Sequence, residues 1–85
     1  MLDDKVILIT GGTGSFGHKF TERIFKKFNP RKLIIYSRDE YKQYLMQKRY
    51  EPWLKRMRFQ IGDVRDQARL EMVFDEFQPE VVFHA

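Results

Sequence analysis

The sequence contains no cysteine and no long apolar run, and these two absences exclude whole classes of protein. Without cysteine, the chain can form neither a disulfide framework nor a thiolate-ligated metal site. No apolar run reaches the roughly 18 residues needed to span a bilayer. No secretion-signal pattern precedes the first strand-like run, which begins at Lys5. We therefore expect a cytoplasmic protein with no membrane partner.

Proline is also scarce, and each of the three prolines interrupts a helical pattern. Pro30 and Pro79 each follow an amphipathic stretch, and Pro52 follows a polar one; proline cannot continue a helix. The 85 residues have an apolar content typical of folded proteins, with no linker, repeat or low-complexity segment. We expect a single unit over residues 1–85 with no internal boundary, corresponding to the N-terminal part of a larger domain.

Apolar runs and helical patterns alternate along the chain. Four buried-type strands are predicted at residues 5–10, 32–37, 57–63 and 80–85. Helices are predicted at residues 15–28 and 39–50, and a third follows an N-terminal cap at Asp66. This β-α-β-α-β-α-β order predicts an α/β fold: the first half of a Rossmann-type parallel sheet, with right-handed crossovers and helices on both faces.

Glycines spaced three apart follow the first predicted strand. Gly11, Gly14 and Gly17 form the pattern G-x-x-G-x-x-G between a strand and an amphipathic helix. In a dinucleotide-binding loop one glycine makes the turn, another lets the backbone approach the pyrophosphate, and a third lets the helix pack closely. Residues Thr13, Ser15 and Phe16 lie within this loop and would add backbone and hydroxyl contacts.

Two alternatives to a dinucleotide loop can be weighed. A P-loop needs lysine directly after its last glycine, but His18 stands there, so this alternative is rejected. A glycine turn without any ligand is disfavoured because strand, loop and helix occur together.

The end of the second predicted strand favours NADP over NAD. An NAD site usually has an acidic residue here, whereas this chain has Ser37 followed by Arg38, with Lys42 one helical turn later. Serine can donate to a 2′-phosphate and arginine can pair with it. Asp39 keeps NAD as the alternative. The sequence S-x-x-E from Ser37 to Glu40 also predicts a capping box with Ser37 as the helix cap.

The ends of the third and fourth strands supply further candidates. Asp63 could accept a hydrogen bond from the adenine amino group and Val64 could pack on the ring, although a turn aspartate after Gly62 would look the same. His84 and Ala85 end the fourth strand beside the expected crevice. A lone histidine there is more often structural than catalytic.

Basic residues alternate with aromatic ones between Lys42 and Arg58. Tyr44, Tyr50 and Trp53 lie among these cations, and the chain carries a net charge of +4. Such a pattern can bind nucleic acid, but no nucleic-acid motif accompanies it. A solvated helix face is therefore preferred, and no nucleic-acid partner is expected. A non-enzymatic module that binds a nucleotide or RNA stays an alternative.

With these residues in place, the sequence resembles the extended short-chain dehydrogenase/reductase family. The segment TGGTGSFG, residues 10–17, matches its T-G-x-x-G-x-x-G pattern. Within that family it is most similar to the inverting UDP-N-acetylglucosamine 4,6-dehydratases of polysaccharide and flagellin-sugar biosynthesis. That similarity continues in YSRDEYKQYLM (residues 36–46), IGDVRD (61–66) and VVFHA (81–85). It implies NADP bound by residues 13–16, by Asp63, Val64 and Ala85, and by the segment Ser37, Arg38, Asp39, Glu40, Tyr41 and Lys42.

The resemblance also implies a reaction and a missing part. Family members take a hydride from sugar C4 onto NADP⁺, lose water across C5–C6 and return the hydride to C6, which gives a 4-keto-6-deoxy sugar nucleotide. Their Y-x-x-x-K pair, acid and base residues and UDP-sugar pocket lie beyond residue 85. No catalytic residue is therefore assigned, the 85 residues alone are expected to be inactive, and a homo-oligomer is expected of the full-length protein. Another short-chain reductase or a sugar-nucleotide epimerase stays open.

Overall fold

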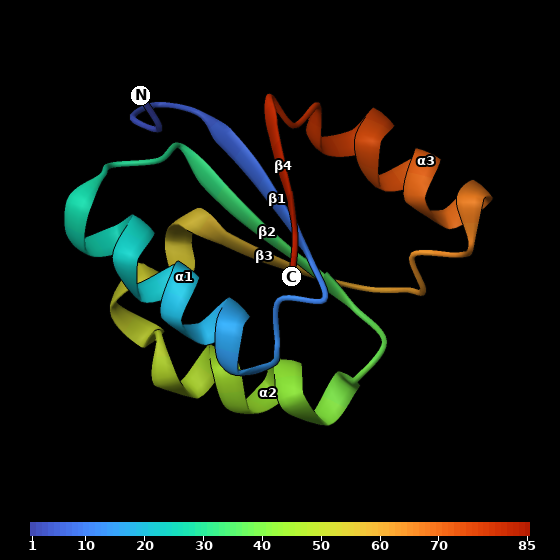
Figure 1. Cartoon of the computed structure of the whole chain (residues 1–85), viewed down its shortest axis with the longest axis horizontal. Helices are drawn as coiled ribbons and strands as arrows, with labels where there is room; N and C mark the ends of the chain where they lie inside the picture. Colours follow the sequence, from blue (N-terminus) through green and yellow to red (C-terminus); the bar gives the residue numbers. More distant parts are fainter.

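The computed structural model describes all 85 residues, and strands and helices alternate throughout (Figure 1). The elements in chain order are β1 (Val6–Thr10), α1 (Ser15–Lys27), β2 (Lys32–Ser37), α2 (Glu40–Arg49), the 3-10 helix η1 (Glu51–Arg56), β3 (Met57–Ile61), α3 (Gln67–Phe77) and β4 (Val81–His84).

The four strands form one parallel sheet in the order β3-β2-β1-β4. The two central strands are the most buried: all of β1 is buried, as is β2 after Lys32. Sequence order and spatial order differ because the chain returns from β3 across the sheet to β4. The predicted Rossmann-type α/β class is confirmed.

The two sheet faces have separate cores, because successive side chains of a strand point to opposite faces. Ile7, Ile9, Leu33 and Ile35 pack with α1, α2 and η1 on one face. The intervening side chains of β1 and β2 pack against Val73 of α3 on the other. Figure 1 shows α1 and α2 together on one side of the sheet and α3 alone on the opposite side.

Several predicted boundaries differ from the structure. The third strand ends at Ile61 rather than Asp63, and the first two helices are slightly shorter than predicted. The segment around Pro52, predicted only as an interruption, forms η1, because proline is tolerated in the first turn of a helix. Phe16, whose spacing of four residues from Phe20 and eight from Ile24 suggests a place on the buried face of α1, keeps 60% of its surface exposed.

No helix of the structure has the length and apolar character required to cross a lipid bilayer.

Candidate functional site

A cleft runs along the edge of the sheet where the strands end, as expected for ligands of open parallel sheets. It has two adjoining compartments that share Gly11, Ser37 and Arg38. The first has a volume of about 570 Å³, within the range of small-molecule sites. Its remaining walls are Thr10, Tyr36, Gly62, Asp63, Val64, Arg65, His84 and Ala85. The second is wholly polar, and its remaining walls are Thr13, Gly14, Asp39, Glu40 and Lys42.

The three spaced glycines have three different structural roles. Gly11 has a φ of +68°, which side-chain-bearing residues rarely adopt, so it makes the turn after β1. A Cβ at Gly14 would meet no atom within 4 Å, so this backbone faces open space. A Cβ at Gly17 would overlap the backbone of Gly12, so α1 packs directly on the loop. Turn, open approach and close packing are the three needs of a pyrophosphate-binding loop.

The beginning of α1 leaves its backbone amides available. Gly14 is the N-cap residue, no side chain accepts a hydrogen bond there, and the first turn has no acidic residue. The other two α-helices are capped by their own aspartates, Asp39 in α2 and Asp66 in α3; the Asp66 cap confirms the sequence prediction. The unpaired N–H groups and the positive end of the helix dipole at α1 are suited to an anion.

Ser37 does not cap α2, so the predicted capping box is wrong. Asp39 is the N-cap, and its carboxylate accepts a hydrogen bond from the backbone N–H of Lys42 at 3.0 Å. Ser37 is instead the last residue of β2, is 6% exposed, and accepts a hydrogen bond from the side-chain amide of Gln43 at 2.9 Å. The serine belongs to the strand because the cap position falls two residues later than the pattern S-x-x-E implies.

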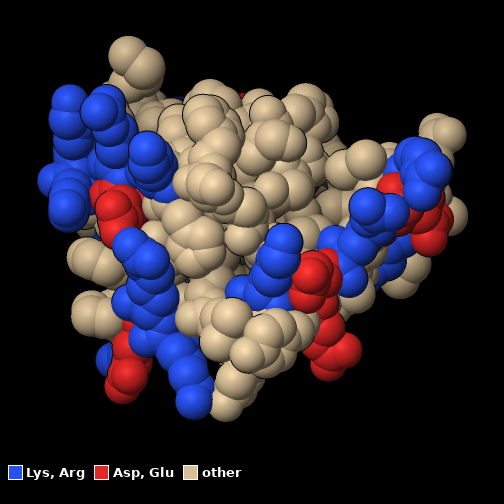
Figure 2. Space-filling view, turned by 60° about the horizontal axis from the view of Figure 1, so that its bottom comes forward, with Lys and Arg blue, Asp and Glu red and all other residues tan.

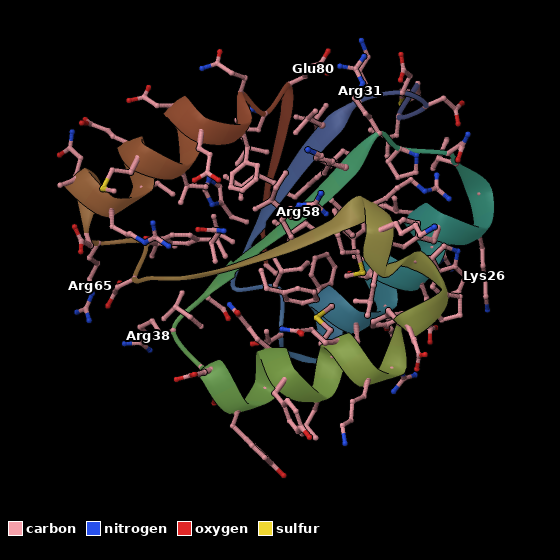
Figure 3. The ribbon with its side chains drawn as sticks, turned by 180° about the vertical axis from the view of Figure 1, so that it is seen from behind. Lys26, Arg31, Arg38, Arg58, Arg65 and Glu80 are labelled. Atoms are coloured by element: carbon pink, nitrogen blue, oxygen red, sulfur yellow. The ribbon has the colours of Figure 1, made fainter.

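Asp63 is held between two arginines. Its carboxylate accepts from the guanidinium of Arg65 at 3.0 and 3.3 Å and from the backbone N–H of Arg65 at 2.8 Å. Arg38 approaches the same carboxylate at 3.5 Å from the end of β2. Figure 3 shows Arg38 and Arg65 at the same edge of the sheet. The hydrogen bonds from Arg65 lower the pKa of Asp63 to about 2, so it stays ionised at neutral pH.

Tyr36 forms part of the floor of the first compartment. Its side chain is fully buried, and its hydroxyl donates to the backbone carbonyl of Asp63 at 2.9 Å. A Cβ at Gly62 would overlap the Tyr36 ring, which explains the glycine there. Burial raises the pKa of Tyr36, so the hydroxyl stays a donor. The tyrosine therefore fixes the position of the loop that carries Asp63 and Val64.

His84 and Thr10 pair at the other end of the first compartment. The Oγ1 atom of Thr10 lies 2.6 Å from Nδ1 of His84, and these residues are register partners of β1 and β4. The backbone N–H of Ala85 continues the pairing by donating to the Thr10 carbonyl at 2.9 Å. This contact gives His84 a structural partner.

Most of the predicted site residues line the cleft, but four of them do not. Ser15, Phe16 and Gly17 lie in the first turn of α1, where the ring of Phe16 stacks on that of Phe20 at 5.7 Å. Tyr41 is 67% exposed and lies outside both compartments. Four wall residues of the first compartment were not predicted, Thr10, Tyr36, Gly62 and Arg65, and neither was Gln43, which lines no compartment but donates to Ser37. The sequence signal for Arg65 was its place two residues after Asp63.

Two of the three aromatic residues that suggested a nucleic-acid surface, Tyr50 and Trp53, have packing roles. Tyr50 is 1% exposed, and Trp53 stacks on Phe25 with ring centroids 5.3 Å apart. On the face drawn in Figure 2, basic side chains lie in separate groups with acidic ones between them. The stacking surface that single-stranded nucleic acid needs is therefore not formed by Tyr50 or Trp53.

Tyr44 and Lys48 have the spacing Y-x-x-x-K, but they are placed away from the cleft. Both lie on α2, and the Lys48 ammonium sits 4.8 Å above the Tyr44 ring. They border a separate surface hollow together with Glu51 and Leu54. A cation–π contact on an exposed helix face accounts for this pair.

The two compartments differ in the chemistry of their walls. The second compartment combines the glycine loop with the cations Arg38 and Lys42, which suits phosphate groups. The first has the exposed side chain of Val64, which could pack on a ring, with polar groups beside it. No group of three or more metal-ligating side chains occurs in the chain.

Comparisons with known proteins assign the chain to one family. A family model described as polysaccharide biosynthesis protein matches residues 7–85. The chain is 46% identical over its whole length to the inverting UDP-N-acetylglucosamine 4,6-dehydratase of Campylobacter jejuni strain 81-176, of which it covers 24%. It is 39% identical over 88 aligned residues to the UDP-glucose 4-epimerase of Rickettsia bellii, of which it covers 25%.

Solved structures have the same fold. Pen from Bacillus thuringiensis superposes on the whole chain with a TM-score of 0.89 and 30% identity, and the chain covers 25% of it. The dTDP-glucose 4,6-dehydratase of Bacillus anthracis, solved in complex with NAD, superposes on 94% of the chain with a TM-score of 0.69. The chain covers 26% of that structure. Because the two sequences are only 22% identical, this similarity shows the fold alone. The chain thus spans about a quarter of the length of the relatives it matches.

Proposed function

The chain belongs to the polysaccharide biosynthesis protein family, and on this basis we propose that it is the NADP-binding part of a UDP-N-acetylglucosamine 4,6-dehydratase. The dehydratase assignment rests on the 46% identity to the Campylobacter jejuni enzyme over the whole chain. The full-length protein would make a 4-keto-6-deoxy sugar nucleotide for a surface polysaccharide or flagellin glycan. A cytoplasmic location and a homo-oligomeric assembly stay predictions.

One observation carries the cofactor proposal: the open, uncapped glycine loop and the end of β2 face the same polar compartment. Gly11, Thr13 and Gly14 of the loop border it on one side, just before the uncapped start of α1, and Ser37, Arg38 and Lys42 border it on the other. The first group would hold the pyrophosphate. The second would hold a phosphate on the adenosine ribose, because it offers a hydroxyl and two cations.

The acidic residues of this compartment explain why NADP is preferred to NAD in the proposal. The carboxylate of Asp39 is engaged by the first turn of α2, and the position at the end of β2 is Ser37 rather than an acid. An NAD site would use a carboxylate at that position for the ribose hydroxyls. NAD is the alternative cofactor.

The described residues would bind and orient the cofactor and would leave the sugar chemistry to other residues. Asp63 and Val64 would contact the adenine, and Ala85 would lie beside the nicotinamide ribose. When bound, NADP⁺ would supply a hydride acceptor that returns the hydride to the sugar. With its pKa lowered to about 2, Asp63 is a weak base and has no proton to donate at neutral pH, and His84 is paired with Thr10, so no residue of the cleft is assigned as the general acid or base.

Titration of the polypeptide with NADP and NAD tests the cofactor proposal. We expect NADP to bind more tightly than NAD. The substitution Arg38→Ala should weaken the binding of NADP by about tenfold or more, because hydrogen bonds to charged groups contribute roughly 1.5–3 kcal/mol. The same substitution should change the binding of NAD little. Arg31→Ala is the matched control, because Arg31 is paired with Asp4 and lies at the other end of the sheet from Arg38 (Figure 3). A folded polypeptide that binds neither cofactor would refute the proposal.

A sugar-nucleotide epimerase is the second candidate, because the chain is 39% identical to the Rickettsia bellii UDP-glucose 4-epimerase. The two activities have different products. A 4,6-dehydratase at its natural length converts UDP-N-acetylglucosamine into a product lighter by one water, whereas an epimerase gives an isomer of equal mass. Liquid chromatography coupled to mass spectrometry separates them, because the dehydrated product differs from the substrate in mass and an isomer differs from it in retention time. An isomer of unchanged mass would favour the epimerase.

A further inference from the structure

Gln43 occupies an unusual position for a polar residue of a helix. It lies one turn into α2, is only 3% exposed, and directs its side chain to the ends of β2 and β3. Its Nε2 atom lies 2.8 Å from the Gln60 carbonyl oxygen, 2.9 Å from the Ser37 hydroxyl oxygen and 3.4 Å from the Ser37 carbonyl oxygen. A buried amide in such surroundings is fixed in orientation, because only the NH₂ group can face carbonyl oxygens.

The hydrogen-bond inventory at Ser37 determines which way its hydroxyl points. The Ser37 carbonyl already accepts from the backbone N–H of Gly62 at 2.9 Å. The two amide hydrogens of Gln43 go to its two nearest acceptors, the Gln60 carbonyl at 2.8 Å and the Ser37 hydroxyl oxygen at 2.9 Å, whereas the Ser37 carbonyl is more distant at 3.4 Å. An amide nitrogen accepts no hydrogen bond, so the Ser37 hydroxyl must accept from Gln43 and direct its own hydrogen elsewhere.

The remaining direction for that hydrogen is the cleft. Ser37 borders both compartments, next to Arg38, and its hydroxyl has no hydrogen-bond partner other than Gln43. We propose that Gln43 is a positioning residue that makes Ser37 a dedicated hydrogen-bond donor to an anionic oxygen on the adenosine ribose. It would thereby set the preference for NADP without touching the cofactor. This inference rests on the proposed cofactor function.

The test is a cycle of variants measured by equilibrium titration with NADP and NAD, using the polypeptide at its natural length. The variants are Gln43→Met, Ser37→Ala and the double variant. Each single substitution is expected to lower the ratio of NADP to NAD affinity by about five- to tenfold, as for the loss of one directed hydrogen bond. The double variant is expected to fall no further than either single one, because Gln43 acts through Ser37.

The control is Gln47→Met, the same chemical change at an exposed position of the same helix; its ratio should match the wild type. The inference is overturned if Gln43→Met leaves the ratio within about twofold of wild type, or if the two single effects multiply in the double variant. Wild-type protein that binds neither cofactor would overturn the proposed function itself, so the two failures are distinguishable.

A second measurement needs no substitution, in case Gln43→Met does not fold. The side-chain amide protons of Gln43 in the wild-type polypeptide can be followed by NMR during both titrations. Their resonances are expected to shift with NADP and to move far less with NAD, because only the 2′-phosphate draws on the Ser37 hydroxyl. Equal shifts with both cofactors would overturn the inference.

Discussion

Alanine substitutions at Gly17 and Gly14, two glycines of the same loop, should affect different properties: the first the stability of the fold, the second the affinity for NADP. A methyl group at Gly17 would overlap the carbonyl oxygen, carbonyl carbon and Cα of Gly12, and all three are backbone atoms that cannot rotate away. Overpacking typically costs about 1–3 kcal/mol, and we expect the upper end or more for a backbone clash. For a domain of this size, about 3 kcal/mol lowers the Tm by roughly 12–24 °C.

At Gly14 the same methyl group would meet nothing within 4 Å, and its backbone is extended with φ −83°. Alanine reduces the freedom of the unfolded chain by about 0.4–1 kcal/mol but is a poorer N-cap residue by a similar amount. The free energy of unfolding should therefore change by about 0.5 kcal/mol or less. The methyl would occupy the space through which phosphates reach the α1 amides, so NADP affinity should fall at least about tenfold.

Thermal unfolding followed by circular dichroism measures the first effect, and titration with NADP below the lower Tm measures the second. Gly17→Ala should lose stability, and Gly14→Ala should keep stability while losing affinity. The assignment of roles within the loop is refuted if Gly17→Ala unfolds at the wild-type temperature. A Gly14→Ala variant that binds NADP as tightly as wild type would refute the approach of phosphate at that glycine.

Three further predictions concern stability. Asp66→Ala removes the carboxylate that accepts from the Arg69 backbone at the start of α3 and should lower the free energy of unfolding by about 1 kcal/mol in urea titrations; an unchanged midpoint would contradict the cap. The pKa of Asp63 is lowered from 3.8 to about 2 by its hydrogen bonds from Arg65, so its contribution is present above pH 3.8 and is lost as the pH falls toward 2. Asp63→Asn should flatten the acid limb of the stability profile, and an equally steep limb would argue against the pair. Burial lowers the pKa of His18 from 6.5, so its contribution is present above pH 6.5 and declines below it. His18→Gln should remove that decline in urea titrations on either side of pH 6.5, and the same decline in the variant would assign it to another group.

The sheet was predictable because its strands carry their information locally. Four-residue or longer apolar runs separated by helical patterns are typical of strands buried on both faces, and β1 and β2 are the most buried strands of the structure. The cap at Asp66 was equally local, since the accepting side chain and the donating N–H are three residues apart. The segment η1 was less predictable, because a proline shows where a helix stops and does not show which structure follows it. The exact ends of the strands were also less predictable.

The candidate site was predictable only in part, since some of its contacts join separate elements. The capping box predicted at Ser37 was a local pattern, and a tertiary contact prevents it from forming. The serine stays in β2, where it contacts the side-chain amide of Gln43, and that amide also donates to the β3 backbone. Nothing in the spacing of Gln43 distinguishes it from an exposed helical glutamine such as Gln47. The pairing of Asp63 with Arg38 likewise depends on two strands ending side by side.

The glycine loop and the end of β2 therefore determine different properties of the candidate site. The spacing of Gly11, Gly14 and Gly17 specifies backbone geometry, in which one residue turns, one leaves space and one packs. That geometry suits a pyrophosphate whichever dinucleotide carries it. Discrimination between cofactors requires groups that reach the ribose, and in the proposed cofactor site these are Ser37 and Arg38, which border the polar compartment. A substitution in the loop should accordingly change the affinity for NADP and NAD together, whereas one at Ser37, Arg38 or Gln43 should change their ratio.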